Sequence, residues 1–208
     1  MSWVTDITHF GGVLDPSSRA PGPAKLIARF FGSIVQAATA WPPGEMIDSA
    51  IHCRRKPKRK ACAGRIRLVL VEHDESGNPD SDVRILWECP LCKDNGVIRN
   101  WKGTDWDLSD VERDDGFWDH ETLHLTLSDE EYLALREELA HDRKLLALVI
   151  VARSTDVGPM MEMTLGETHR LVEGVFQVMK VGYGKRKRLL EGVMNKLHEV
   201  LPGAGPIQ

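Results

Sequence analysis

Four cysteines are the residues in this chain whose type and spacing predict chemistry. The sequence has four cysteines in all, at positions 53, 62, 89 and 92. Cys89 and Cys92 have the two-residue gap of a zinc knuckle, and structural zinc is commonly held by four thiolates in tetrahedral geometry. Cys53 and Cys62 form a wider pair. The sequence predicts one structural Zn²⁺ per chain, with every ligand position filled by protein. Two alternatives stay open: His52 replaces a cysteine ligand, or the thiols are buried and unrelated.

The loop between the first two cysteines predicts an anion-binding surface. It carries six cations and no acidic residue, and restricting such a loop lowers the entropy that it loses on gripping phosphates. A second cationic group lies near the C-terminus, and three tryptophans near the cysteines could stack on bases. The alternatives are a solvated loop and tryptophans that pack in the core. The candidate residues are Arg54, Arg55, Lys56, Lys58, Arg59 and Lys60, then Lys180, Lys185, Arg186, Lys187 and Arg188, and Trp87, Trp101 and Trp106.

The stretch His120–His124 reads HETLH and matches the H-E-x-x-H pattern of zinc metallohydrolases. That chemistry needs a helix, on which two histidines one turn apart bind zinc and the glutamate serves as base. Leu123, Leu125 and Leu127 instead alternate with polar residues, as in a strand. On a strand the two histidines would lie about 13 Å apart, too far for one ion. We therefore expect no catalytic residue here and no enzyme, and keep the metallohydrolase as an alternative.

Periodicity predicts the elements that position these residues. Helices are expected at 23–41, from the capping box at Ser128 to about 140, from the capping box at Thr164 onward, and at about 185–201. Strands are expected at 64–72, 83–89, 97–101, 123–127 and 160–164, with a polar hairpin loop at 73–82. The apolar run 145–152 is predicted to be a buried strand, and residues 1–22 to be irregular.

These elements predict an α+β fold. A zinc β-ribbon is joined to an N-terminal helix and to a C-terminal strand/helix domain that ends in two helices. The expected boundaries are an N-terminal segment at 1–50, a zinc-ribbon module at 51–104, an acidic linker at 105–122 and an α+β domain at 123–208. The hairpin between the two cysteine pairs would bring them together.

The chain resembles a family of bacterial proteins. The residues that carry the resemblance are WVTDITHF near the start, CRRKPKRKACAGRI and WECPLCKDNGVIRNWKGTDWDL. That family bears a degenerate zinc-ribbon insert and has no assigned activity, so the resemblance implies the metal clip and nothing catalytic. Most zinc ribbons place a glycine directly after the second knuckle, where this chain has Lys93.

Composition and charge limit the kinds of partner that the chain is expected to bind. The net charge of −4 argues against a protein that coats nucleic acid with its whole surface. The charge is unevenly distributed, because an acidic segment at 105–142 follows the basic loop. No apolar run is long enough for a membrane span, and the N-terminus lacks the pattern of a signal peptide, so a cytoplasmic protein is expected. Nucleic-acid binding through residues 54–60 is our first prediction. The alternative is an adaptor that binds an acidic protein surface, with homo-oligomers as one form of it.

Overall fold

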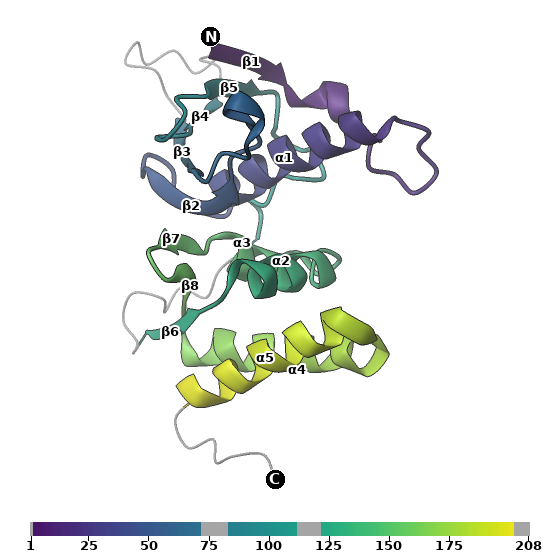
Figure 1. Cartoon of the computed structure of the whole chain (residues 1–208), viewed down its shortest axis with the longest axis vertical. Helices are drawn as coiled ribbons and strands as arrows, with labels where there is room; N and C mark the ends of the chain where they lie inside the picture. Colours follow the sequence, from purple (N-terminus) through teal and green to yellow (C-terminus); the bar gives the residue numbers. More distant parts are fainter. Residues whose placement is uncertain (1, 72–82, 112–121, 202–208) are drawn as a thin grey trace. The chain divides into compact units, whose positions relative to one another are not determined.

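The chain forms two compact units. The computed structural model describes residues 2–71, 83–111 and 122–201, and the chain divides into Met1–Asp110 and Val111–Gln208 (Figure 1). Each unit combines helices with a β-sheet, which confirms the predicted α+β class. Among the described residues, no helix combines the length and apolar character that crossing a membrane requires.

The first unit is a five-stranded sheet with a helix across one face. Its strand order is β1-β5-β4-β3-β2. β1 runs parallel to β5, and the other neighbours are antiparallel. Two short 3₁₀ turns, η1 (Ile7–Phe10) and η2 (Pro57–Arg59), follow β1 and β2. The strands are β1 (Ser2–Asp6), β2 (Ile47–His52), β3 (Arg65–Val71), β4 (Arg84–Glu88) and β5 (Asn95–Arg99).

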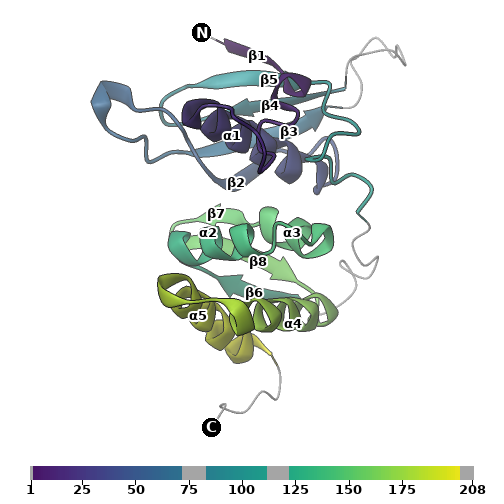
Figure 2. The ribbon, with the colours of Figure 1, turned by 90° about the vertical axis from the view of Figure 1, so that its right-hand side faces the viewer.

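Helix α1 (Gly22–Thr39) covers one face of this sheet (Figure 2). Pro23 occupies the first helical turn, where its missing N–H costs no hydrogen bond. The helix buries Phe31, Ile34 and Val35, and the alternating strand β3 buries Ile66, Leu68 and Leu70. An amphipathic helix on a sheet with one apolar face gives this unit its core.

The second unit is a three-stranded antiparallel sheet packed with four helices. The strand order is β7-β8-β6. Ser128 and Thr164 open α2 and α4 with complete capping boxes, as predicted. The last helix, α5, buries Leu190, Val193 and Leu197. The elements are β6 (Leu123–Thr126), β7 (Arg153–Thr155), β8 (Gly158–Met163), α2 (Asp129–Glu138), α3 (Arg143–Ile150), α4 (Leu165–Val181) and α5 (Gly184–Val200).

Two predictions of secondary structure are wrong. The apolar run from Leu145 forms helix α3, because Asp142 caps it by accepting hydrogen bonds from the backbone N–H groups of Lys144 and Leu145. Residues 1–22 are not all irregular, because β1 pairs with β5. The predicted hairpin loop at 73–82 and residues 112–121 of the acidic linker lie outside the described residues. The predicted domain boundaries stay predictions.

Candidate metal centre and the basic loop

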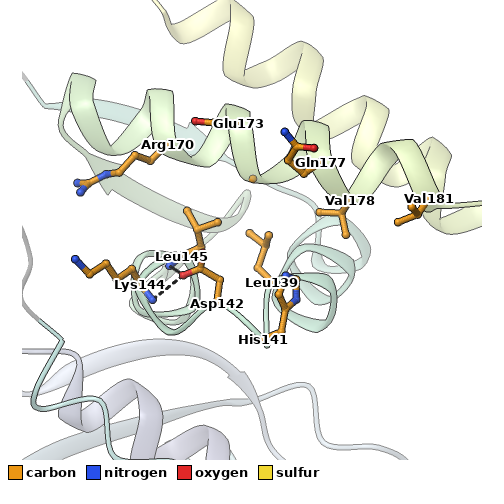
Figure 3. Close-up of a pocket in the computed structure, with 11 residues that line it drawn as sticks. Leu139, His141, Asp142, Lys144, Leu145, Arg170, Glu173, Gln177, Val178 and Val181 are labelled. Atoms are coloured by element: carbon orange, nitrogen blue, oxygen red, sulfur yellow. Dashed lines mark hydrogen bonds between the residues drawn. The ribbon is translucent and has the colours of Figure 1, made fainter.

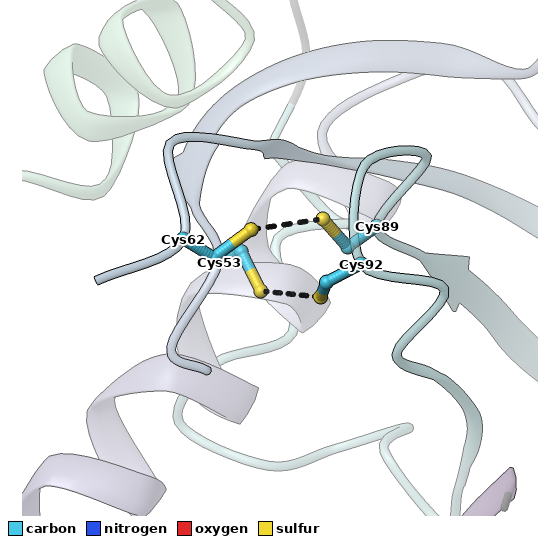
Figure 4. Close-up of side chains that lie close together, drawn as sticks. All are labelled: Cys53, Cys62, Cys89 and Cys92. Carbon is cyan, nitrogen blue, oxygen red and sulfur yellow. Dashed lines mark hydrogen bonds between the residues drawn. The ribbon is translucent and has the colours of Figure 1, made fainter. Parts of the chain in front are cut away.

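The four cysteine sulfurs converge on one point of the first unit. All four Sγ atoms lie within 4.8 Å of one another, and Cys53, Cys62 and Cys89 are buried. Cys53 faces Cys92 and Cys62 faces Cys89 (Figure 4). The sulfurs of these pairs lie 3.6 and 3.8 Å apart. A disulfide would bring two sulfurs to about 2.05 Å, so these are free thiols. The arrangement fits four ligands around one metal ion.

Two chain turns present the sulfurs; one precedes β3 and the other follows β4, so both lie at the same end of this antiparallel pair. Cys53 follows β2, and its N–H donates to the carbonyl of Gly64 at 2.8 Å. Cys89 follows β4; its N–H donates to the carbonyl of Asp94 at 2.7 Å, and its carbonyl accepts from the N–H of Lys93 at 2.9 Å. The left-handed residue of this second turn is Lys93, with φ 60°. Lys93 therefore adopts the backbone conformation for which most zinc ribbons use a glycine.

Burial and hydrogen bonds act in opposite directions on the thiols of the cluster. Burial raises the pKa of Cys53 and of Cys89. Burial also acts to raise the pKa of Cys92, but hydrogen bonds from the backbone of Asp94 and from neighbouring thiols outweigh it and lower that pKa overall. Further N–H groups point at sulfur: Arg55 donates to Cys53 at 3.4 Å and Gly64 to Cys62 at 3.4 Å. A hydrogen bond from an N–H group to sulfur favours the thiolate form of a cysteine. A bound divalent ion would offset the repulsion between neighbouring thiolates.

Arg54 is half-buried and packs against aromatic rings of β1 and α1. Its guanidinium carbon lies 4.7 Å from the ring centre of Trp3 and 5.4 Å from those of Phe30 and Phe31. Its Nε and Nη2 atoms are buried, and no described residue forms a hydrogen bond with them. Trp3 in turn donates from Nε1 to Asp94 at 3.1 Å. Arg54 thus joins the loop to β1 and α1 through cation–π contacts.

The other five cations of the loop are exposed: Arg55, Lys56, Lys58, Arg59 and Lys60. Arg55 lies 3.8 Å from Asp94. Lys58 and Arg59 have φ of 52° and 66°, in the left-handed region that side chains rarely adopt. The N–H of Cys62 donates to the carbonyl of Arg55 at 2.9 Å, which closes the loop beside the sulfurs.

The second cationic group lies on α4, which carries Lys180, and on the first turn of α5, and it is partly neutralised. Lys185 pairs with Glu130 at 2.8 Å, and Arg186 pairs with Glu137 at 2.7 Å and with Glu138 at 2.9 Å. Lys187 and Arg188 are exposed, as is Lys180, which lies 4.5 Å from the ring centre of Phe176.

The tryptophans mostly serve packing. Trp87 and Trp101 are 2% and 1% exposed, so neither ring is available to a base. Trp87 packs edge-on against Phe30 and Phe31, with ring centres 5.6 and 6.0 Å away. Trp106 is half-buried. Its ring lies so close to Gly32 of α1 that position 32 has no room for a side chain.

The H-E-x-x-H stretch does not form a described metal site. His124 lies on strand β6 as predicted; it is exposed and faces Glu162 across the sheet. His120 lies outside the described residues. Within the described ranges the four cysteines are the one group of potential ligands close enough to hold an ion.

The second unit also contains a hollow of about 530 Å³ that no sequence pattern had indicated. It lies between α4 and the connection from α2 to α3, as Figure 3 shows. Its floor is apolar, with Leu139, Leu145 and Val178, and charges of both signs surround it.

Comparisons with known proteins add no relative. No family model matches the chain, and neither a curated protein nor a solved structure matches it significantly. The resemblance to a bacterial zinc-ribbon family stays a prediction from the sequence. What the structure supports is a four-cysteine cluster suited to one metal ion.

Proposed function

We propose that the first unit is a non-catalytic zinc-binding module that binds nucleic acid through its basic loop. The observation that carries this proposal is the position of the loop. Residues 54–61 run between two cysteines of the cluster, so a bound metal would fix both ends of the loop. Five of its cations are exposed to solvent.

Zinc is the metal that these ligands favour. A tetrahedral ion with Zn–S bonds of about 2.3 Å separates its sulfurs by about 3.8 Å, close to the 3.6 and 3.8 Å of the two facing pairs. Elemental analysis should find about one zinc per chain. Cys89→Ser should lose it, whereas replacing His120 and His124 together with Ala should leave the zinc content unchanged. A folded wild-type protein without metal would refute the proposed site.

The basic loop would contact nucleic acid through charged side chains and not through aromatic rings. Trp87 and Trp101 are buried, so base stacking contributes nothing from them. Contacts would therefore go to phosphates, which gives sequence-tolerant and salt-sensitive binding. The left-handed backbone of Lys58 and Arg59 stores strain, which often accompanies functional loops.

The salt dependence of binding tests the loop directly. Each phosphate neutralised adds about 0.7 to 0.9 to the log–log slope of affinity against salt, so three or four contacts predict a slope of roughly 2 to 4. Replacing Lys56, Lys58, Arg59 and Lys60 with Ser should flatten this slope for single-stranded and duplex probes alike, and should keep the zinc.

The matched control removes the same formal charge elsewhere. Replacing Lys185, Arg186, Lys187 and Arg188 with Ser also deletes four cations, but two of these already pair with glutamates. We expect a smaller change of slope. Equal changes of slope in the two variants would mean that binding depends on the net charge of the protein and not on the basic loop. If the wild type binds neither probe at low salt, the proposal fails and the adaptor alternative, with an acidic protein surface as partner, takes its place.

A further inference from the structure

The outer edge of the first unit's sheet is an unprotected strand. β1 pairs with β5 on one side, and no described strand lies on its other side (Figures 1 and 2). Natural sheets protect such edges with lysines, prolines or bulges, because the unpaired N–H and C=O groups would otherwise pair with another chain. β1 reads Ser-Trp-Val-Thr-Asp and has none of these. Val4 is 70% exposed and Trp3 39%.

An apolar row crosses the sheet and ends at this edge. Strand pairing places Val4 opposite Val97, Val97 opposite Leu86, and Leu86 opposite Val69. These residues lie on the face away from α1, because the alternate residues of the same strands form the buried face. A hollow of about 320 Å³ lies along the row, with the 65% exposed Met46 at its border.

The row is flanked by polar rows. On one side Ser2, Asn95, Glu88, Arg67 and Asp48 follow one another across the strands. On the other side Asp6 pairs with Arg99. The apolar row thus forms a stripe that is open at Val4, and its polar borders define one register for any strand added there.

We propose that a second copy of this chain pairs with the β1 edge, so that two sheets join through antiparallel β1 strands. A two-fold axis beside Val4 sets Val4 opposite the partner's Val4, and the stripe then continues into the second sheet. The same register sets Ser2 opposite the partner's Asp6 and Trp3 opposite the partner's Thr5, so no like charges face each other. A self-complementary strand is what a two-fold interface requires.

The proposal is tested on the full chain, with any tag at the C-terminus, by light scattering after size exclusion. The chain mass is 23.3 kDa, and the wild type should show twice this mass at tens of micromolar. Val4→Lys should raise the dissociation constant by about tenfold or more, because two lysines would then face each other across the axis. Val157→Lys is the matched control: Val157 is 78% exposed in the second unit and should leave the dimer unchanged.

Hydrogen exchange locates the interface. The amides of residues 2–6 should gain protection as the wild-type concentration rises, and should not do so in Val4→Lys. Zinc content and circular dichroism show whether that variant is folded. A wild type that stays monomeric overturns the proposal, and so does a dimer that Val4→Lys does not weaken.

Discussion

Gly64 lies against two sulfurs of the metal centre. A Cβ atom at this position would meet Sγ of Cys89 at 2.5 Å, Cβ of Leu91 at 2.9 Å and Sγ of Cys62 at 3.4 Å. Two of these atoms would be zinc ligands, which cannot move without changing the metal geometry. Gly64→Ala should therefore weaken zinc binding by about tenfold or more, since such overpacking costs about 1–3 kcal/mol.

Competition with a colorimetric chelator measures this loss. Gly22→Ala is the control, because nothing lies within 4 Å of a Cβ added at the start of α1. It should keep zinc affinity and leave stability unchanged or slightly higher. Equal zinc affinity in Gly64→Ala and the wild type would mean that the sulfurs do not hold the ion in this geometry.

Arg54 and Lys56 should differ although they are two residues apart in the same basic loop. Arg54 packs on Trp3, Phe30 and Phe31, so Arg54→Ala should lower the free energy of unfolding by about 1–2 kcal/mol and leave the salt slope of nucleic-acid binding unchanged. Lys56 is exposed. Lys56→Ala should reduce the slope by about 0.7 to 0.9 and leave stability unchanged. Urea unfolding and probe titrations separate the two effects, and the reverse pattern would refute this division.

The cysteines and Arg54 differ in how far the sequence could predict their roles. Cys89 and Cys92 follow the spacing of a zinc knuckle, and the chain's two other cysteines lie at 53 and 62, so the cluster was predictable. The role of Arg54 was not, because its partners Trp3 and Phe30 come from β1 and α1, and nothing local to the loop brings them there.

At the scale of elements, local sequence signals predicted the features that local contacts determine. The capping boxes at Ser128 and Thr164 place both helix starts, because the cap is made within four residues. Helix α3 was missed because it buries every residue from Leu145 to Ile150, so no amphipathic period marks it. The Asp142 cap was the overlooked signal. Strand β1 was missed because its partner β5 lies far along the chain.

Glu131 makes the packing of α2 on α5 sensitive to pH. Its carboxylate accepts from the Ser128 N–H and from Lys196 Nζ, both at 2.7 Å. Burial acts to raise its pKa, but Lys196 and Ser128 outweigh burial and lower the pKa below 4.5. A lowered folded-state pKa stabilises the fold above the unfolded value, and this contribution is lost as pH falls through the folded value.

The expected result is a pH-dependent difference between Glu131→Gln and the wild type. The variant should be less stable above about pH 4.5, and the difference should shrink as the pH falls further. Hydrogen exchange of α2 and α5 between pH 3 and 6 reports on this unit alone. Lys196→Met should remove part of the same dependence, because Lys196 is the strongest of the groups that lower this pKa. Parallel pH curves for Glu131→Gln and the wild type would contradict the assignment.

At the scale of the whole molecule, the chain has two cores, and the metal centre belongs to one of them. In the first unit, Ile34 on α1 and Ile66, Ile85 and Ile98 on the sheet are fully buried. In the second, Leu135, Val149, Leu171 and Val193 are fully buried. That α1 belongs with the strands of the ribbon could not be predicted, because pairing between elements depends on packing and not on local pattern.

Removing the metal should therefore act on one unit. Zinc binding contributes about 10–16 kcal/mol in small zinc-dependent peptides, comparable with the roughly 5–15 kcal/mol stability of a whole domain. Chelation should expose the amides of β3, which begins beside Cys62, and of β4, which ends beside Cys89, while α4 and α5 keep their protection. Hydrogen exchange with and without chelator measures both in the same sample, and added zinc should restore the first unit. Equal loss of protection in α4 and α5 would show that the second core depends on the first, and unchanged protection in β3 and β4 would show that the cysteines need no metal to hold this fold.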